Sequence, residues 1–197
     1  LLKACVVISF RYNIICGLNP NEQEKVYNKL AYELSQGSLT TINEIIDKLK
    51  AIYPEDASFF AAFSEKEINT NGGRNNKIVK YILFNLEKQL SNNDFNNDSD
   101  KYSIEHILPE NPDESWTNYE ESRDERFIYR LGNLTLLNKM ENRDIANKNY
   151  ESKKTVYENS QFVLTKEIAQ DYDFWDIDKI ANRQKQLAKL AKGIWKL

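Results

Sequence analysis

The chain has 197 residues, of which 41% are hydrophobic and 29% charged, a composition typical of a folded protein that excludes global disorder. Its formal net charge of −3 excludes a basic field over the whole molecule, so any contact with nucleic acid must come from a local cluster. This length suffices for a substantial core, as one domain or as two small ones.

The N-terminal segment LLKACVVISFRYNIICG is apolar but interrupted by Lys3 and Arg11, so it is too polar for a transmembrane span and lacks a signal-peptide cleavage pattern. Its two cysteines, Cys5 and Cys16, form no CxxC pair, which favours reduced thiols. Together these features lead us to expect a cytoplasmic protein without a membrane partner. The chain begins with Leu inside this pattern, and we expect it to be the C-terminal part of something longer.

Apolar residues at helical spacing predict that residues 1–95 are a run of helices. Asn19-Pro20 precedes one helix that Gly37 closes, and Thr40 or Thr41 caps the next, which Pro54 ends. Because this half carries no chemistry-bearing motif, we interpret it as a helical region belonging to a larger upstream module. The segments expected to be helical are 4–15, 22–37, 40–54, 56–65 and 77–90.

The polar, turn-rich segment 91–101 predicts the boundary with a second domain, residues 96–197. In chain order this domain shows a short strand that Pro109 ends, an acidic loop over 110–126, a second strand with Gly132 at a bend, and one or two helices over 139–160. A long amphipathic helix then ends the chain. We expect that helix to pack as a lid, with a partner-binding helix as the alternative.

The one histidine of the chain, His106, follows Glu105 in the first of these strands. Imidazole titrates near neutrality and can take a proton from water, and a carboxylate can hold a hard divalent cation. In an isolated Glu-His pair, the histidine is more often a core or surface residue without a catalytic role, beside a solvated carboxylate. The pattern downstream, with GNLTLL and an Asn-rich helix, favours a phosphodiesterase centre instead.

Strand, loop, strand and helix, with Glu-His on the first strand and asparagines later, resemble the HNH (ββα-metal) nuclease fold. The resemblance implies an α+β, mostly α protein in which a helical shell surrounds a small hairpin-helix motif. It also implies His106 as general base, Asn133 as the residue that orients the loop, and Glu105 and Asn142 as ligands of one Mg²⁺ or Mn²⁺. Asn147 is the alternative to Asn142.

More specifically, IEHILPE, RLGNLTLLN, KNYESKK, DFW and RQKQLAKLAKGIW in this order resemble the C-terminal nuclease domain of GmrSD-type modification-dependent restriction endonucleases, over about residues 75–197. This implies a DNA endonuclease of a restriction or phage-defence system. It further implies a ParB-like nucleotide-hydrolysing domain upstream, whose DGQQR-type motif this chain does not contain.

Cations around the proposed helix are candidate phosphate contacts that would offset the missing overall charge, although a solvated helix face is the plainer interpretation. We expect the three tryptophans, Trp116, Trp175 and Trp195, to be packing anchors. Two other functions stay open: a non-catalytic DNA-binding or protein-interaction module that keeps the fold, and an RNA-directed nuclease. The candidate phosphate contacts are Lys139, Arg143, Lys148, Lys153 and Lys154.

Overall fold

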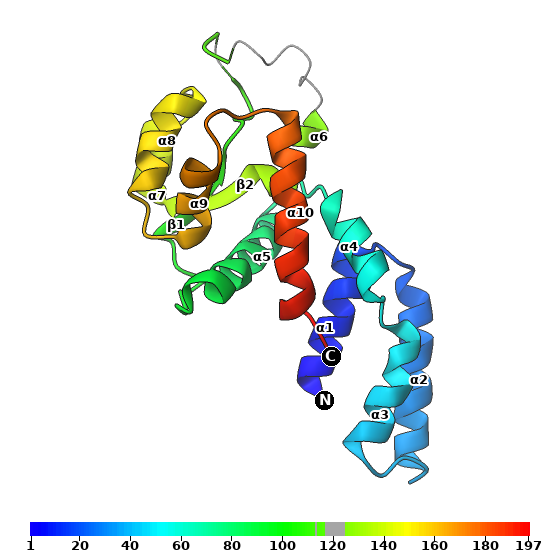
Figure 1. The fold of residues 1–197 in the computed structure, drawn as a ribbon. Coiled ribbons are helices and arrows are strands. Elements are labelled where there is room, and N and C mark those ends of the chain that lie inside the picture. The colour runs from blue at the N-terminus through cyan, green and yellow to red at the C-terminus, as the bar shows by residue number, and fades with distance from the viewer. Residues whose placement is uncertain (113, 117–124) are drawn as a thin grey trace. The chain divides into compact units, whose positions relative to one another are not determined.

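The computed structural model describes residues 1–112, 114–116 and 125–197, so the acidic loop expected at 110–126 lies partly outside the described residues. Contacts divide the chain into two compact units (Figure 1). Unit 1 comprises Leu1–Phe63 together with Trp195–Leu197, and unit 2 comprises Ser64–Ile194. Within the described residues, no helix is both long and apolar enough to cross a membrane.

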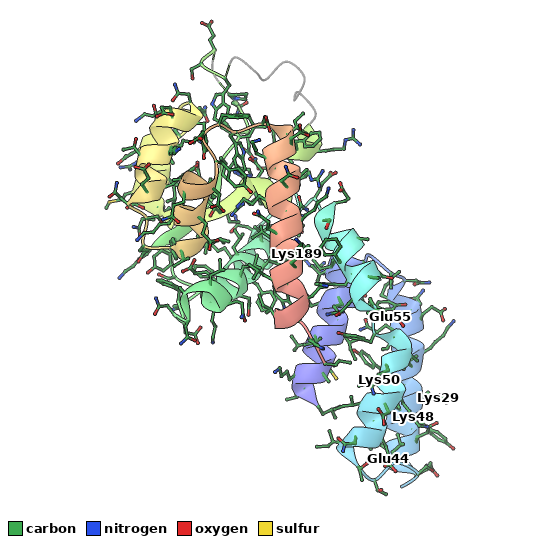
Figure 2. The ribbon with its side chains drawn as sticks, in the orientation of Figure 1. Lys29, Glu44, Lys48, Lys50, Glu55 and Lys189 are labelled. Atoms are coloured by element: carbon green, nitrogen blue, oxygen red, sulfur yellow. The ribbon has the colours of Figure 1, made fainter. Side chains whose placement is uncertain are left out.

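Unit 1 is helical, as the sequence predicts. Asn19 caps α2 with Pro20 as the first helical residue, and Thr41 with Glu44 forms a capping box on α3. The exposed faces of α2 and α3 carry charges of both signs, including Lys29, Glu44 and Lys48 (Figure 2). The helices are α1 Leu2–Ser9, a π-helical turn Phe10–Ile15, α2 Pro20–Ser35, α3 Ile42–Leu49, a 3₁₀ turn Lys50–Ile52 and α4 Asp56–Ser64.

The π-helical turn places a fully buried arginine, Arg11, at the centre of unit 1. Its Nε donates to the carbonyl of Trp195, and its Nη1 donates to the carbonyl of Pro54 at 2.9 Å. Its Nη2 pairs with Asp56 at 2.8 Å. Trp195 in turn stacks on Phe10 with 4.1 Å between ring centroids. A buried guanidinium is tolerable only with such partners, so Arg11 ties the chain's last residues into unit 1.

Unit 2 is built around two antiparallel strands, β1 Tyr102–His106 and β2 Leu134–Asn138, with Glu105 opposite Thr135 and His106 opposite Leu134. The expected strand pair and the mostly α, α+β fold are therefore confirmed. Two helices, α6 and α9, were not predicted. The second strand was expected over 127–138, but its first part instead forms the end of α6 and a 3₁₀ turn, and only Leu134–Asn138 pairs as a strand. The helices are α5 Gly73–Ser91, α6 Glu125–Ile128, α7 Lys139–Ile145, α8 Tyr150–Glu158, α9 Val163–Asp171 and α10 Ile177–Ile194, with a 3₁₀ turn at Leu131–Asn133.

Helices α5, α7 and α9 contact the strand pair, while α8 packs on α9 (Figure 1). The boundary expected between residues 95 and 96 therefore differs from the observed division after Phe63. The physical reason is that α5 buries Val79, Ile82 and Leu86 completely within unit 2. The polar segment 91–101 is thus a connection inside one unit, from α5 to β1, and does not separate two cores.

The long C-terminal helix, α10, packs over the turn that precedes β2, as a lid. Gly132 in that turn lies so close that an added Cβ would overlap the main-chain oxygen of Ile180 and lie 2.8 Å from Cβ of Gln184. Gln184 accepts a hydrogen bond from the Gly132 N–H, and Arg183 donates to the Gly132 carbonyl at 2.7 Å. A glycine is required here for the approach of α10, rather than for a special backbone angle.

Candidate active site

His106 ends β1, and its ring lies in a polar surrounding that the sequence motif alone did not predict. Its Nε2 is 3.2 Å from the Thr70 hydroxyl and 3.9 Å from the Glu110 carboxylate. The ring packs edge-on against Tyr129 with centroids 5.8 Å apart. The Tyr129 hydroxyl donates to Glu110 at 3.0 Å and accepts from Asn71 at 2.8 Å. A connected network thus surrounds Nε2.

Burial lowers the pKa of His106 to about 4, with the Glu110 carboxylate opposing this shift and the Lys153 ammonium adding to it. The imidazole is consequently neutral at physiological pH. The side chain nevertheless keeps 17% of its surface exposed. A neutral imidazole with an exposed part is the state that a general base requires.

Asn133 is completely buried, and its amide uses all of its hydrogen-bonding capacity. Oδ1 accepts from the Leu108 N–H at 2.8 Å and from the Trp175 indole at 3.0 Å. Nδ2 donates to the carbonyls of Leu108 at 2.9 Å and Ile128 at 3.0 Å. Asn133 therefore holds the main chain two residues beyond His106, which suits the orienting role expected of it. That role stays a prediction.

Glu105 lies on the opposite side of β1 from His106, because successive residues of a strand point to opposite faces. Its side chain is 3% exposed. Oε1 accepts from the Lys153 ammonium at 2.7 Å and from the Tyr157 hydroxyl at 2.8 Å. Burial raises the pKa of Glu105, with Lys153 and Tyr157 opposing that rise. The expected metal ligand is thus already engaged in a buried ion pair.

Asn142 on α7 donates its amide to the carbonyl of Ile104 at 2.8 Å. That residue is two positions before His106, about 7 Å along a strand. Because a carbonyl only accepts, the contact fixes Nδ2 on Ile104 and turns the amide oxygen away from it. The preceding Glu141 has a carboxylate oxygen that is buried with no hydrogen-bond partner in the described part of the chain.

The donor set therefore fits a divalent cation only in part. Asn142 and Glu141 offer oxygen atoms of the kind Mg²⁺ and Mn²⁺ accept, whereas Glu105 in its present contacts does not. Among residues 1–112, 114–116 and 125–197, no group of three or more His, Cys, Asp or Glu side chains has the arrangement of a metal site. A tight all-protein cage of such residues is absent from that part of the chain.

The five candidate phosphate contacts fall into three groups. Lys139, Arg143 and Lys148 are exposed on α7 and the turn after it. Lys154 is half-buried and pairs with Asp173 at 3.0 Å. Lys153 differs from the expectation, because its side chain is fully buried against Glu105 and cannot meet a phosphate without leaving that partner. The alternative ligand Asn147 is exposed, and its carbonyl accepts from Trp116.

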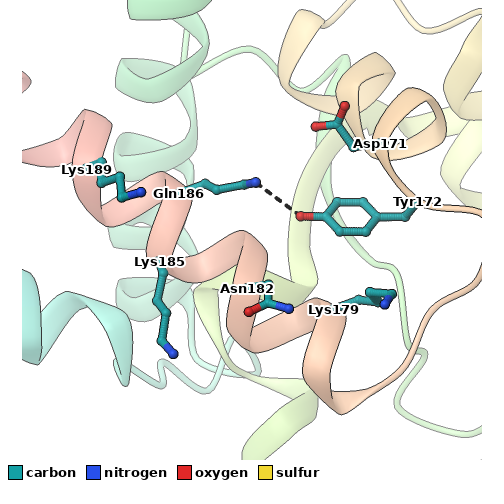
Figure 3. Close-up of a pocket in the computed structure, with 7 residues that line it drawn as sticks. All are labelled: Asp171, Tyr172, Lys179, Asn182, Lys185, Gln186 and Lys189. Atoms are coloured by element: carbon teal, nitrogen blue, oxygen red, sulfur yellow. Dashed lines mark hydrogen bonds between the residues drawn. The ribbon is translucent and has the colours of Figure 1, made fainter.

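Unit 2 also has an open polar cleft of about 440 Å³ between the end of α9 and α10 (Figure 3). Three lysines of α10, Lys179, Lys185 and Lys189, line it with Asp171, and the Tyr172 hydroxyl donates to Gln186 at 3.1 Å. His106 takes its contacts from other elements, so the cleft is a separate feature.

Comparison with known proteins shows the family of this chain. The family model described as the C-terminal domain of GmrSD restriction endonucleases matches residues 53–190, which include both strands and the Glu-His and asparagine positions. A search of the curated proteins finds no match. Because the family model covers more than half of the chain, the chain belongs to the GmrSD restriction endonuclease family through its C-terminal domain.

Proposed function

We propose that unit 2 is an HNH endonuclease domain that hydrolyses phosphodiester bonds of DNA within a restriction or phage-defence protein. The observation that carries this proposal is His106, partly exposed at the end of β1, with the Thr70 hydroxyl next to its ring and with Asn133 fixing the following main chain at Leu108. The family match supports a nuclease, and the HNH chemistry is our extension of it.

In this mechanism His106 takes a proton from the attacking water. With Nε2 facing the Thr70 hydroxyl and the Glu110 carboxylate, Nδ1 is the nitrogen that is left for the water. The carboxylate of Glu110 then stabilises the imidazolium that forms, because an opposite charge about 4 Å away favours the protonated ring. Thr70 and Glu110 would orient the ring without touching the substrate.

We propose Mg²⁺ or Mn²⁺ as the required cofactor, which would neutralise charge at the scissile phosphate. Asn142 is the expected ligand that the geometry favours, and substrate and water would complete the coordination. We do not propose Glu105 as a ligand, since its carboxylate is bound by Lys153 and Tyr157. A cation held so sparsely should bind weakly in the absence of substrate.

The test is cleavage of supercoiled plasmid DNA and of RNA, with Mg²⁺, with Mn²⁺ and with chelator. We expect metal-dependent cleavage of DNA, and His106→Ala should lower its rate by about 10²- to 10⁴-fold, the contribution of a positioned general base. High Mn²⁺ should not rescue this variant. Lys29→Ala, an exposed change in unit 1, is the matched control and should cleave normally.

Each alternative has its own outcome. Wild-type rates from a folded His106→Ala protein would refute His106 as the base. Cleavage of RNA in preference to DNA would favour the RNA-directed nuclease. A folded wild-type protein that binds DNA and cleaves neither nucleic acid with either metal would favour the non-catalytic module.

A further inference from the structure

A fully buried lysine contacts the main chain of the histidine on which the proposed chemistry depends. Lys153 Nζ lies 2.7 Å from Oε1 of Glu105 and donates to the carbonyl of His106, also at 2.7 Å. The hydroxyl of Tyr157, one turn further along α8, reaches the same carboxylate oxygen at 2.8 Å. We call Glu105, Lys153 and Tyr157 the buried triad.

The buried triad joins α8 to the end of β1. β1 carries Glu105 and His106 as its last two residues, and α8 supplies the other two members. Lys153 and Tyr157 are four residues apart and so lie on one face of the helix. Lys153, Tyr157 and Glu105 are 0%, 0% and 3% exposed, so these polar groups are shielded from water. Hydrogen bonds in such surroundings are strong and directional.

The buried triad also occupies the side of β1 that faces away from the His106 ring. On the ring side, Thr70 and Glu110 lie next to the imidazole. On the other side, the ammonium of Lys153 restrains the carbonyl that belongs to the same residue. Asn133 fixes the following segment at Leu108. Lys153 and Asn133 therefore restrain the main chain at His106 and just after it, whereas Thr70 and Glu110 contact only the ring.

We infer that Lys153 is a positioning residue for His106, and that Glu105 anchors Lys153 instead of binding the metal ion. This inference rests on the proposed function only in taking His106 as the base. An ion pair buried among apolar side chains costs desolvation, and a nonpolar pair of similar volume is often at least as stable. The contact of Lys153 with the His106 carbonyl gives the Glu105–Lys153 ion pair a role other than stabilising the fold.

The decisive variant is Glu105→Gln combined with Lys153→Met, because Lys153→Met alone leaves a carboxylate buried without its cation and should be less stable in urea. The matched control is Glu22→Gln with Lys25→Met, which removes an exposed ion pair of the same 2.7 Å length in unit 1. Both double variants remove one charge of each sign, so the net charge stays constant.

We expect the decisive variant to fold and to cleave with a kcat about ten- to hundredfold lower, the effect of misplacing a reacting group by about 1 Å. KM for DNA and the half-saturating Mn²⁺ concentration should stay unchanged. Because the chain has one histidine, the ¹H–¹³C correlation of its ring reports on His106 alone. That signal should shift in the decisive variant and stay in place in the control.

Unchanged kcat in the decisive variant would overturn the inference. So would a Glu105→Gln protein that needs at least tenfold more Mn²⁺ and recovers full kcat at saturation, since this identifies a metal ligand. If the wild-type protein cleaves nothing, the proposed function fails separately. The ring signal then decides alone: an unmoved signal in the folded decisive variant refutes positioning by Lys153, and a shifted one supports it.

Discussion

At the scale of single residues, the polar groups around His106 divide into those the motif predicts and those that only the fold brings near. Glu105, Asn133 and Asn142 were named from the sequence pattern. Thr70 lies 36 positions from His106, and Lys153 lies 48 positions from Glu105. No spacing rule links residues so far apart. Glu110, four residues after His106, was within reach of the sequence argument, because it follows Pro109 in the same motif.

The burial of His106 predicts a pH dependence of stability. Its folded pKa of about 4 lies below its ordinary 6.5, so between these values the unfolded chain binds more protons. The contribution of His106 to the free energy of unfolding is therefore full above pH 6.5 and is lost as the pH falls toward 4. Between pH 7 and pH 5 the loss should be about 2 kcal/mol.

Urea unfolding of wild type and of His106→Gln at both pH values measures this effect, since glutamine does not titrate and all other groups are shared. The difference in unfolding free energy between the two proteins should shrink by that amount as the pH falls. A difference that does not change with pH would mean that the imidazole is as accessible to protons in the folded protein as in the unfolded chain.

At the scale of elements, capping and turn signals predicted most helices, and the absence of a local cap explains why α9 was not predicted. Asn19 and Thr41 cap α2 and α3, and their side chains accept main-chain hydrogen bonds. α9 begins at Val163 after Phe162, whose side chain cannot cap it, although Leu164 and Ile168 have helical spacing and are buried. Its first amides donate instead to the carboxylate of Glu87 on α5, a cap 76 positions away that the local sequence does not show. The nine-residue length gives little further periodicity, and packing against α8 and β2 stabilises it.

The exposed cations of α7 and its following turn predict where DNA binds. Changing Lys139, Arg143 and Lys148 together to Gln should weaken DNA binding and reduce the slope of log K against log salt by up to about 3, since each phosphate contact contributes about 0.9. KM should rise more than kcat falls. Filter binding or fluorescence anisotropy at several salt concentrations measures the slope.

The control for this prediction is Lys179, Lys185 and Lys189 changed to Gln, an equal charge change in the separate cleft of α10. We expect that triple variant to keep the wild-type slope. A larger effect from the α10 variant than from the α7 variant would place the nucleic acid on α10, and would contradict the assignment of the α7 cations.

At the scale of the whole molecule, the division into two units did not follow from the sequence. Segment 91–101 has the composition of a linker, yet the helix before it belongs to the same core as the strands after it. Composition reports local polarity, whereas a domain boundary depends on which apolar faces meet. Trp195 belongs to unit 1 through its contact with Arg11, which is 184 positions away. Hydrophobic periodicity cannot predict such a contact.

Trp195 therefore offers a test of whether the two units unfold separately. Its side chain is 2% exposed and stacks on Phe10, while its carbonyl accepts from Arg11. Trp195→Ala should destabilise unit 1 by about 3–5 kcal/mol, the usual cost of removing a buried tryptophan side chain. Hydrogen exchange should then become faster for amides of α1 and of the turn Phe10–Ile15, while β1 and β2 keep their protection.

The matched change in unit 2 is Trp175→Ala, which removes the indole bound to Asn133 and should have the opposite pattern, with β1 and β2 losing protection. If Trp195→Ala instead weakens protection equally in both units, they unfold as one cooperative block.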